Sequence, residues 1–346
     1  MSAKTLGSGY YGEAQGLRPD TKLHRWPINF IFNDGGMGDF VNYAAATLWV
    51  AKNCPWVDGR LFVPRYLVPF MKDVHACAPN WTIYDSENAS ELIEFGSALI
   101  GPGIHMNGAN ITPQYLTVLG AHPVDVGFAY YAGSCPAPAD LTLPMMDYPR
   151  DRLVDKVRAL EAPYVVITTG SQGLSRRVTG KHLNPIIEHV KRRGRMPVFL
   201  GRRDLLRDGK ATTTFPDDVD YHEGLDLRDE TTVKQAACVL QHADATVGLD
   251  SGLLHLAAMM KDSRVVFGYN ITSVAHREPR RNWGRTVNVT VSEDELKCIG
   301  CQSKLKNIAV HKFDKCIYGD SLCVDLLFKD GAARWIAAID EILEVS

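Results

Sequence analysis

The segment Asp250-Ser251-Gly252-Leu253-Leu254-His255 carries the residue types and spacing best suited to chemistry. The apolar run 245–249 before it is typical of a buried strand, and residues 252–260 are typical of a helix. Backbone N–H groups at the start of such a helix bind phosphate, and Gly252 lets a ligand approach the backbone. Asp250 can accept hydrogen bonds from sugar hydroxyls. The alternative is that Asp250 or Ser251 only caps the helix.

A second segment combines small hydroxyl residues with cations. The run 164–169 is typical of a strand, and the turn Thr169-Gly170-Ser171 follows it. Three cations come next, Arg176, Arg177 and Lys181, and Gly201 ends a further strand pattern. Open α/β sheets bind ligands at the carboxyl ends of their strands, so this segment suits a diphosphate. A solvated basic loop is the alternative.

A third segment is the glycine-rich turn Gly36-Met37-Gly38-Asp39, between a strand pattern at 28–32 and a helical pattern at 40–52. Its glycines permit close approach of a ligand to the backbone. The helix dipole favours the ionised form of Asp39. Because Asp is common at helix starts, this turn indicates a site only together with the other two segments.

Four of the eight cysteines follow the spacing C-x2-C-x14-C-x6-C: Cys298, Cys301, Cys316 and Cys323. Four thiolates at such a spacing bind zinc or iron tetrahedrally, and isolated buried thiols are the alternative. The other four are spread singly and are expected to be small core residues: Cys54, Cys77, Cys135 and Cys238.

The composition disfavours several classes of protein. Against 40 acidic residues, 38 basic ones give the 346-residue chain a formal net charge of -2, which is unlike a strongly cationic nucleic-acid binder. With 45% hydrophobic and 23% charged residues, the chain is ordinary for a folded globular protein. No apolar run approaches the roughly 20 residues of a transmembrane helix, and the polar start lacks a signal-peptide core. We therefore expect a cytoplasmic protein with reduced cysteines.

The order of the elements predicts two α/β domains. Strand patterns alternate with helix patterns on both sides of a looser stretch rich in Gly, Pro and Asn, which is typical of parallel sheets. A helix is expected at 150–160. We expect an irregular arm over 1–26, one domain over 27–150, a second over 151–331 that includes the four cysteines, and a C-terminal helix over 332–346.

Together these segments resemble glycosyltransferase family 9, which includes the lipopolysaccharide (ADP-heptose) heptosyltransferases. Residues 250–258, DSGLLHLAA, are close to the family's Asp-Ser/Thr-Gly-x-x-His-x-x-Ala pattern. The segment from Gly268 to Thr272 looks like its Gly-x-Thr donor loop, and Gly38-Asp39 like its Gly-Asp turn. Where the family has a Lys followed by Trp-Pro, this chain has Arg176-Arg177-Val178-Thr179. The resemblance covers about residues 27–75 and 160–345.

The resemblance implies the GT-B fold, with two Rossmann-like doubly wound domains facing a central cleft. It implies an inverting glycosyltransferase that moves a sugar, such as a heptose, from a nucleoside-diphosphate sugar to an acceptor hydroxyl. Asp39 would be the general base, and Arg176 or Arg177 would stabilise the leaving diphosphate. The donor-binding residues would be Gly38, Thr169, Gly170, Ser171, Lys181, Gly201, Asp250, Ser251, Gly252, His255, Gly268 and Thr272.

No catalytic metal is expected, because the arginines and the helix start supply the positive electrostatics. Some enzymes of this kind that modify proteins have a similar cysteine knuckle, which favours a structural zinc or iron at Cys298, Cys301, Cys316 and Cys323. The acceptor is left open among a glycan, a protein side chain and a modified nucleobase, as is the oligomeric state. The alternatives are a nucleotide-sugar epimerase of the same fold and a non-catalytic sugar-nucleotide-binding or assembly protein.

Overall fold

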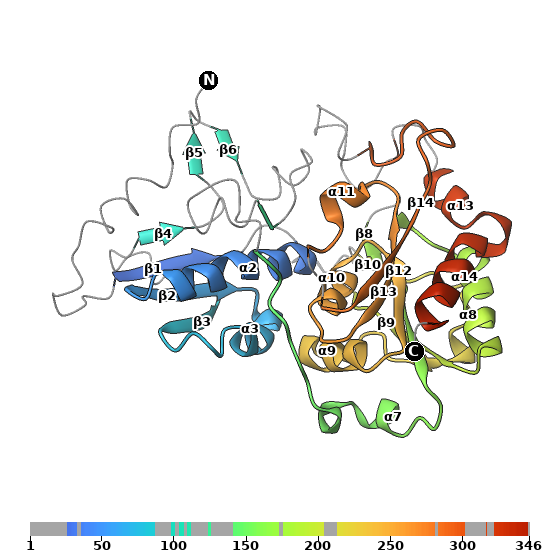
Figure 1. Cartoon of the computed structure of the whole chain (residues 1–346), viewed down its shortest axis with the longest axis horizontal. Coiled ribbons are helices and arrows are strands. Elements are labelled where there is room, and N and C mark those ends of the chain that lie inside the picture. Colours follow the sequence, from blue (N-terminus) through green and yellow to red (C-terminus); the bar gives the residue numbers. More distant parts are fainter. Residues whose placement is uncertain are drawn as a thin grey trace. The chain divides into compact units, whose positions relative to one another are not determined.

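Figure 1 shows the computed structural model of the chain. The structure describes residues 26–32, 36–86, 98–100, 104–106, 109–111, 124–125, 141–172, 176–203, 213–280, 283–301, 316 and 322–344. The chain divides into two compact units, Met1–Pro144 and Met145–Ser346. The arm expected before residue 26 and most of the looser stretch before residue 141 lie outside the described residues.

The first unit contains a four-stranded parallel sheet in the order β3-β2-β1-β4. Its elements are β1 (Trp26–Ile31), α2 (Met37–Asn53), β2 (Val57–Val63), a 3-10 turn (Arg65–Leu67), α3 (Val68–Val74), β3 (Trp81–Asp85), β4 (Ala98–Ile100) and the antiparallel hairpin β5 (Ile104–Met106) and β6 (Ala109–Ile111). Phe32 at the end of β1 packs against Phe40 and Tyr43 of α2, with ring centroids 5.9 and 5.7 Å away. These aromatic contacts hold the start of α2 at the carboxyl end of β1.

The second unit is built on a six-stranded parallel sheet in the order β11-β9-β7-β12-β13-β14. Its strands are β7 (Tyr164–Thr168), β9 (Met196–Leu200), β11 (Leu225–Asp226), β12 (Ala245–Leu249), β13 (Arg264–Tyr269) and β14 (Arg285–Thr290), and a small antiparallel pair joins β8 (Ser171–Gln172) to β10 (Thr213–Thr214). Its helices are α7 (Asp155–Arg158), α8 (Gly180–Arg192), α9 (Val233–Gln241), α10 (Gly252–Ala258), α11 (Val274–Arg277), α13 (Leu322–Leu327) and α14 (Lys329–Glu344), with 3-10 turns at Arg150–Arg152 and Tyr221–Glu223.

Helices cover both faces of this sheet, as expected for a doubly wound α/β unit. Helices α8 and α14 pack together on one face, and α9 and α10 pack together on the other (Figure 1). Two local signals set helix ends. A capping box between Thr232 and Gln235 begins α9, and Gly194, with φ of 70°, ends α8.

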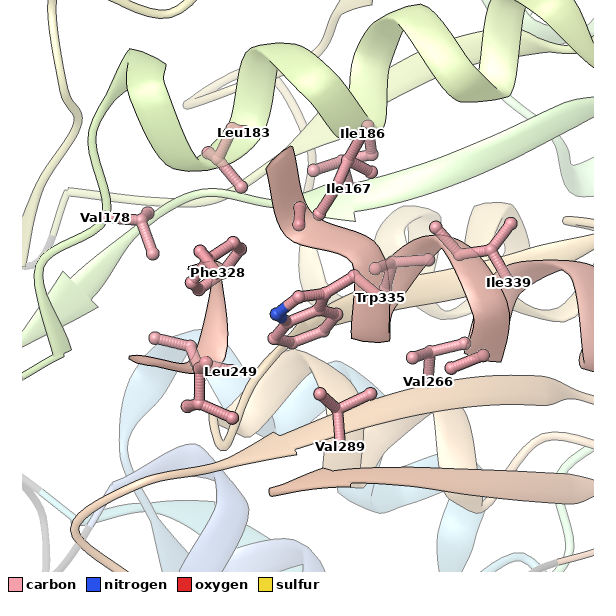
Figure 2. Close-up of a cluster of buried hydrophobic side chains, with 14 of the residues drawn as sticks. Ile167, Val178, Leu183, Ile186, Leu249, Val266, Val289, Phe328, Trp335 and Ile339 are labelled. Atoms are coloured by element: carbon pink, nitrogen blue, oxygen red, sulfur yellow. The ribbon is translucent and has the colours of Figure 1, made fainter. Parts of the chain in front are cut away.

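The core beneath the second sheet is centred on Trp335 of α14, which is fully buried. Figure 2 shows its indole ring among Leu249, Val266 and Val289. Phe328 stacks on the same ring, with centroids 4.9 Å apart. The C-terminal helix is therefore an integral part of the second unit.

Three sequence expectations differ from the structure. Residues 150–160 do not form one helix, because Leu153 and Val154 take extended backbone conformations between the 3-10 turn and α7, where Leu153 becomes buried. Cys77 is exposed rather than in the core. The strands β3, β11 and β14 were not expected, since β11 has only two residues and β14 is largely half-exposed.

Among the helices that the structure describes, none combines the length and the apolar character needed to cross a membrane.

We expect Trp335→Ala to lower the free energy of unfolding of the second unit by about 3–5 kcal/mol, because it leaves a large cavity beneath the sheet. Unfolding by urea, followed by circular dichroism, measures this loss. Trp283→Ala is the matched control, since Trp283 is 42% exposed and its loss leaves no internal cavity. Equal losses in the two variants would contradict the central role of Trp335.

Candidate functional site

The carboxyl ends of adjacent strands bring most of the expected donor-binding residues to one edge of the second sheet. Thr169 and Gly170 follow β7, Gly201 follows β9, and Asp250 follows β12, and these strands are neighbours in the sheet. A Cβ atom at Gly201 would lie 3.6 Å from the backbone nitrogen of Gly170. The parallel topology thus assembles one site from segments that are far apart in the sequence.

Asp250 is the most connected residue of this edge and is buried, with 4% of its surface exposed. Nε2 of His255 lies 3.0 Å from Oδ1 of Asp250, and the hydroxyl of Thr272 donates to Oδ2 at 2.8 Å. The backbone N–H of Asp250 donates to the carbonyl of Gly268 at 2.9 Å. Both carboxylate oxygens therefore bind protein groups, and the side chain ties α10 to the loop after β13.

The electrostatics of Asp250 follow from these contacts. Burial alone raises the pKa of this carboxyl, but the hydrogen bond from His255 and the positive charges of Arg277 and Arg176 outweigh burial and hold its pKa well below the usual range. Because an ionised carboxylate only accepts hydrogen bonds, Nε2 of His255 carries the proton in this contact. The site therefore has a fixed buried negative charge with cations around it.

The structure separates the two arginines of the loop after β7. Arg176 is half-buried, and its Nη1 donates to the backbone carbonyl of Asp250 at 2.7 Å. Arg177 is exposed. Arg176 is thus held at the edge where Asp250 and Ser251 lie. The side-chain hydroxyl of Ser251 is itself buried and makes no hydrogen bond with any residue that the structure describes.

Another expected donor residue, Lys181, pairs with a carboxylate of α13. Lys181 lies in the first turn of α8, and its Nζ forms an ion pair with Asp325 at 2.7 Å. The side chain of Ser171 lies outside the described residues. Lys181 therefore joins α8 to α13 in this structure.

Two glycines of the second sheet are required by close packing. A Cβ atom at Gly248 would lie 1.8 Å from the hydroxyl of Thr168, and one at Gly268 would lie 2.3 Å from the ring of Trp335. Gly268 lies near the end of β13, just before the loop that carries Thr272 to Asp250. The end of β13 therefore lies directly against the core around Trp335.

One group at this edge was missed by the sequence reasoning. Arg228 follows β11, pairs with Asp226 at 2.7 Å, and lies over the rings of Tyr221 and Phe215 at 3.3 and 4.9 Å from their centroids. Phe215 in turn packs on Gly201, since a Cβ atom there would lie 2.5 Å from its ring. The two-residue strand β11 has no periodic pattern in the sequence. The closeness of Asp226 and Arg228 along the chain is the one local signal that could have indicated their ion pair.

In the first unit, Gly38 and Asp39 lie in the first turn of α2, and both are buried. Oδ2 of Asp39 accepts a hydrogen bond from the backbone N–H of Gly36 at 2.9 Å. Asp39 therefore stabilises the start of its own helix at the carboxyl end of β1.

The four spaced cysteines are all described and half-buried, and none is in a disulfide. Burial, together with the nearby charges of Cys301, Cys316 and Cys298, raises the pKa of Cys323 to about 11. Among the described residues, no three His, Cys, Asp or Glu side chains stand in an arrangement that could hold a metal ion. The structure thus brings the four sulfurs into one neighbourhood without showing a ligand set.

A known protein family matches the part of the chain that carries this site. Residues 138–309, which include most of the second unit, match the model of glycosyltransferase family 9 (heptosyltransferase). Among curated proteins, no sequence matches this chain significantly.

Three solved structures share the fold at low sequence identity. The iron-containing dodecameric glycosyltransferase TibC from enterotoxigenic E. coli H10407 is 17% identical with a TM-score of 0.65, and the match covers 93% of this chain and 77% of TibC. TibC in complex with ADP-D-β-D-heptose gives 16% identity, a TM-score of 0.62 and the same coverages. The ADP-heptose lipopolysaccharide heptosyltransferase II of E. coli gives 13% identity and a TM-score of 0.63, with 92% of this chain and 98% of that chain covered. These likenesses establish the GT-B fold.

We expect Asp250→Asn to lower the free energy of unfolding by about 2–4 kcal/mol at pH 7, because the carboxylate is buried among charged and hydrogen-bonding partners. A carboxyl group with a depressed pKa in the folded state stabilises above its unfolded value of about 3.9 and loses this contribution as the pH falls. The difference between the variant and the wild type should therefore narrow below about pH 4. Urea unfolding of the variant and of the wild type at pH 7 and pH 3 measures this difference in the free energy of unfolding.

Asp147→Asn is the control for this experiment. Asp147 also pairs with a cation, Lys261 at 3.1 Å, but its side chain is 54% exposed. Its loss should cost less than about 1 kcal/mol. A loss for Asp250→Asn that is as small, or that grows as the pH falls, would rule out the stabilising role of this carboxylate.

Proposed function

Since the chain belongs to glycosyltransferase family 9, the heptosyltransferase family, and is a glycosyltransferase, we propose that it transfers a sugar from a nucleoside-diphosphate donor to an acceptor hydroxyl with inversion. The observation that carries this proposal is the contact between Arg176 and Asp250 at the edge of the second sheet. It fixes a cation beside the start of α10, where the donor diphosphate would lie.

The donor in this proposal is bound by the second unit. Thr169, Gly170, Gly201, Ser251 and Gly252 offer small side chains and backbone groups around Arg176. The buried, unbonded hydroxyl of Ser251 supports a polar ligand at this position. ADP-heptose is the donor we propose. TibC, which shares the fold, was solved in complex with ADP-D-β-D-heptose, and the E. coli heptosyltransferase II is named for ADP-heptose.

Asp250 and His255 have a positioning role in this proposal. Both are buried, and their mutual hydrogen bond leaves Asp250 engaged by protein groups on each oxygen. Asp250 therefore sets the place of Arg176 and Thr272 instead of binding the sugar hydroxyls.

The reaction is one displacement at the anomeric carbon. As the bond from this carbon to the diphosphate oxygen breaks, negative charge grows on the diphosphate, and Arg176 with nearby N–H groups stabilises it. Asp39, in the first unit, takes the proton of the acceptor hydroxyl as that oxygen forms the new bond. The anomeric centre inverts, and the products are the glycosylated acceptor and the nucleoside diphosphate. The acceptor would be a glycan, a protein or a modified nucleobase, and the enzyme would act in the cytoplasm.

The test measures nucleotide binding and nucleotide release separately. We expect ADP, in a panel with GDP, UDP, CDP and dTDP, to raise the melting temperature of the wild type, because a ligand at 100 times its Kd stabilises by about 2.7 kcal/mol. Arg176→Ala should lose this shift, whereas Arg177→Ala, its matched neighbour, should keep most of it. Asp39→Asn should keep the shift but stop the release of ADP from ADP-heptose, whether an acceptor hydroxyl or water receives the sugar.

Each rival function predicts another result. An epimerase would convert the sugar nucleotide without releasing ADP, and a non-catalytic binding protein would show the shift without any turnover. Full release of ADP by Asp39→Asn would show that another group is the base. A shift that Arg177→Ala loses and Arg176→Ala keeps would reverse the assignment of the two arginines.

We also propose that Cys298, Cys301, Cys316 and Cys323 hold one structural zinc or iron ion. The donor set fits by residue type and spacing, because four thiols suit either metal. The charges of the other three cysteines reach Cys323, which supports a shared site. TibC, which shares the fold, contains iron. The ion would fix the segment before α13 and would take no part in the displacement.

We expect elemental analysis of the purified protein to find one zinc or iron per chain, and Cys298→Ser to lose most of it. Cys238→Ser is the control, since Cys238 is also buried in the second unit but lies on α9. Equal metal content in Cys298→Ser and the wild type would exclude the site.

A further inference from the structure

The loop after β13, residues 270–273, lies against the segment that carries the first two of the four cysteines. The backbone N–H of Gly300 donates to the carbonyl of Asn270 at 2.8 Å. Gly300 has a φ of 66°, and a Cβ atom there would lie 3.3 Å from the Cβ of Ser273. The residue between Cys298 and Cys301 that touches the loop is thus the one residue type that fits both the backbone conformation and the close approach.

Asn270 makes a second contact with the cysteine cluster through its side chain. Its Nδ2 donates to the sulfur of Cys323 at 3.7 Å, and the residue is 1% exposed. One residue of the loop therefore binds both parts of the cluster: the Cys298–Cys301 turn by its backbone, and α13 by its side chain.

The other end of the same loop enters the donor site. Thr272, two residues after Asn270, donates its hydroxyl to the buried carboxylate of Asp250. The backbone carbonyl of Asp250 accepts the hydrogen bond of Arg176. Hydrogen bonds at both ends of a short stretch of backbone thus link Cys323, through Asn270, Thr272 and Asp250, to the arginine of the donor site.

We propose that Asn270 is a positioning residue that couples the four-cysteine cluster to the donor loop, so that affinity for the donor diphosphate depends on the state of Cys323. This inference rests on the proposed donor function of the loop. When the sulfur of Cys323 is in place, Asn270 holds the loop from both sides and Thr272 reaches Asp250. When that sulfur is removed or chemically altered, the amide of Asn270 loses this hydrogen-bond acceptor. The loop then also adopts other conformations, which bind the diphosphate less well.

The coupling can be measured with a double-mutant cycle on Asn270 and Cys323, using ADP as the probe. Asn270→Ala and Cys323→Ala should each raise the Kd of ADP by about tenfold, the size expected for one lost hydrogen bond to a partner in a buried site. The double variant should bind no more weakly than either single variant, because both changes remove the same contact. Cys238→Ala is the control for thiol loss and should leave the Kd unchanged.

Two further measurements separate positioning from general destabilisation. Asn270→Ala should raise KM for the sugar nucleotide with kcat nearly unchanged, because the chemistry at Asp39 and Arg176 is intact once the donor is bound. Asn270→Asp, which keeps the shape but replaces the N–H donor with an acceptor, should behave like Asn270→Ala. Wild-type ADP affinity in Asn270→Asp would overturn the proposal.

Hydrogen exchange provides a test that depends neither on nucleotide binding nor on the folding of Cys323→Ala. In Asn270→Ala, amide exchange should quicken in residues 270–273 and at Gly300, and stay unchanged in α9. Unchanged amide exchange rates in the loop would refute the coupling. So would a double variant in which the two losses of ADP binding free energy simply add. Failure of the wild type to bind ADP would instead count against the proposed donor function, while the exchange result would still decide the coupling.

Discussion

A buried carboxylate organises the ligand-binding edge of the second unit. Burying the charge of Asp250 is costly unless donors and cations surround it. His255 from α10 and Thr272 from the loop after β13 supply the donors, and Arg176 and Arg277 supply positive charge. Two segments, α10 and the loop after β13, are thereby hydrogen-bonded to one side chain. The negative charge also keeps Arg176 at the start of α10, where an anionic ligand needs a cation.

The arrangement depends equally on the parallel sheet. In the order β9-β7-β12-β13, each strand ends beside its neighbour, so the turns after residues 168, 200 and 249 and the loop after β13 form one surface. The glycines at this edge serve packing as well as ligand access. Gly268, for example, lies against Trp335, so a side chain there would displace the core before it reached any ligand.

Much of this could be predicted from the sequence, for a physical reason. Buried parallel strands are short continuous apolar runs, and their helices carry amphipathic patterns and caps, so β7, β9, β12, β13, α8, α9 and α14 were expected close to where they lie. The residues at strand ends followed directly, including Asp250 and Thr169. The order of strands, which makes those ends neighbours, was implied only by the resemblance to the family.

Other features depend on tertiary contacts that no local pattern contains. The distinction between Arg176 and Arg177 follows from a bond to a carbonyl 74 residues away. Lys181 pairs with Asp325 on a distant helix, and Arg228 follows a strand of two residues. In the same way, spacing alone indicated the four cysteines but not the contact of Cys323 with Asn270.

The position of Trp335 also determines when the second unit can finish folding during synthesis of the chain. Gly268, near the end of β13, rests on a ring that is synthesised 67 residues later, and the same ring fills the space beneath β12 and β14. A nascent chain that has already made every residue of the ligand-binding edge still lacks the support of that edge. The second unit therefore completes its core only after α14 has left the ribosome, and long-range contacts of this kind slow the search for the native sheet.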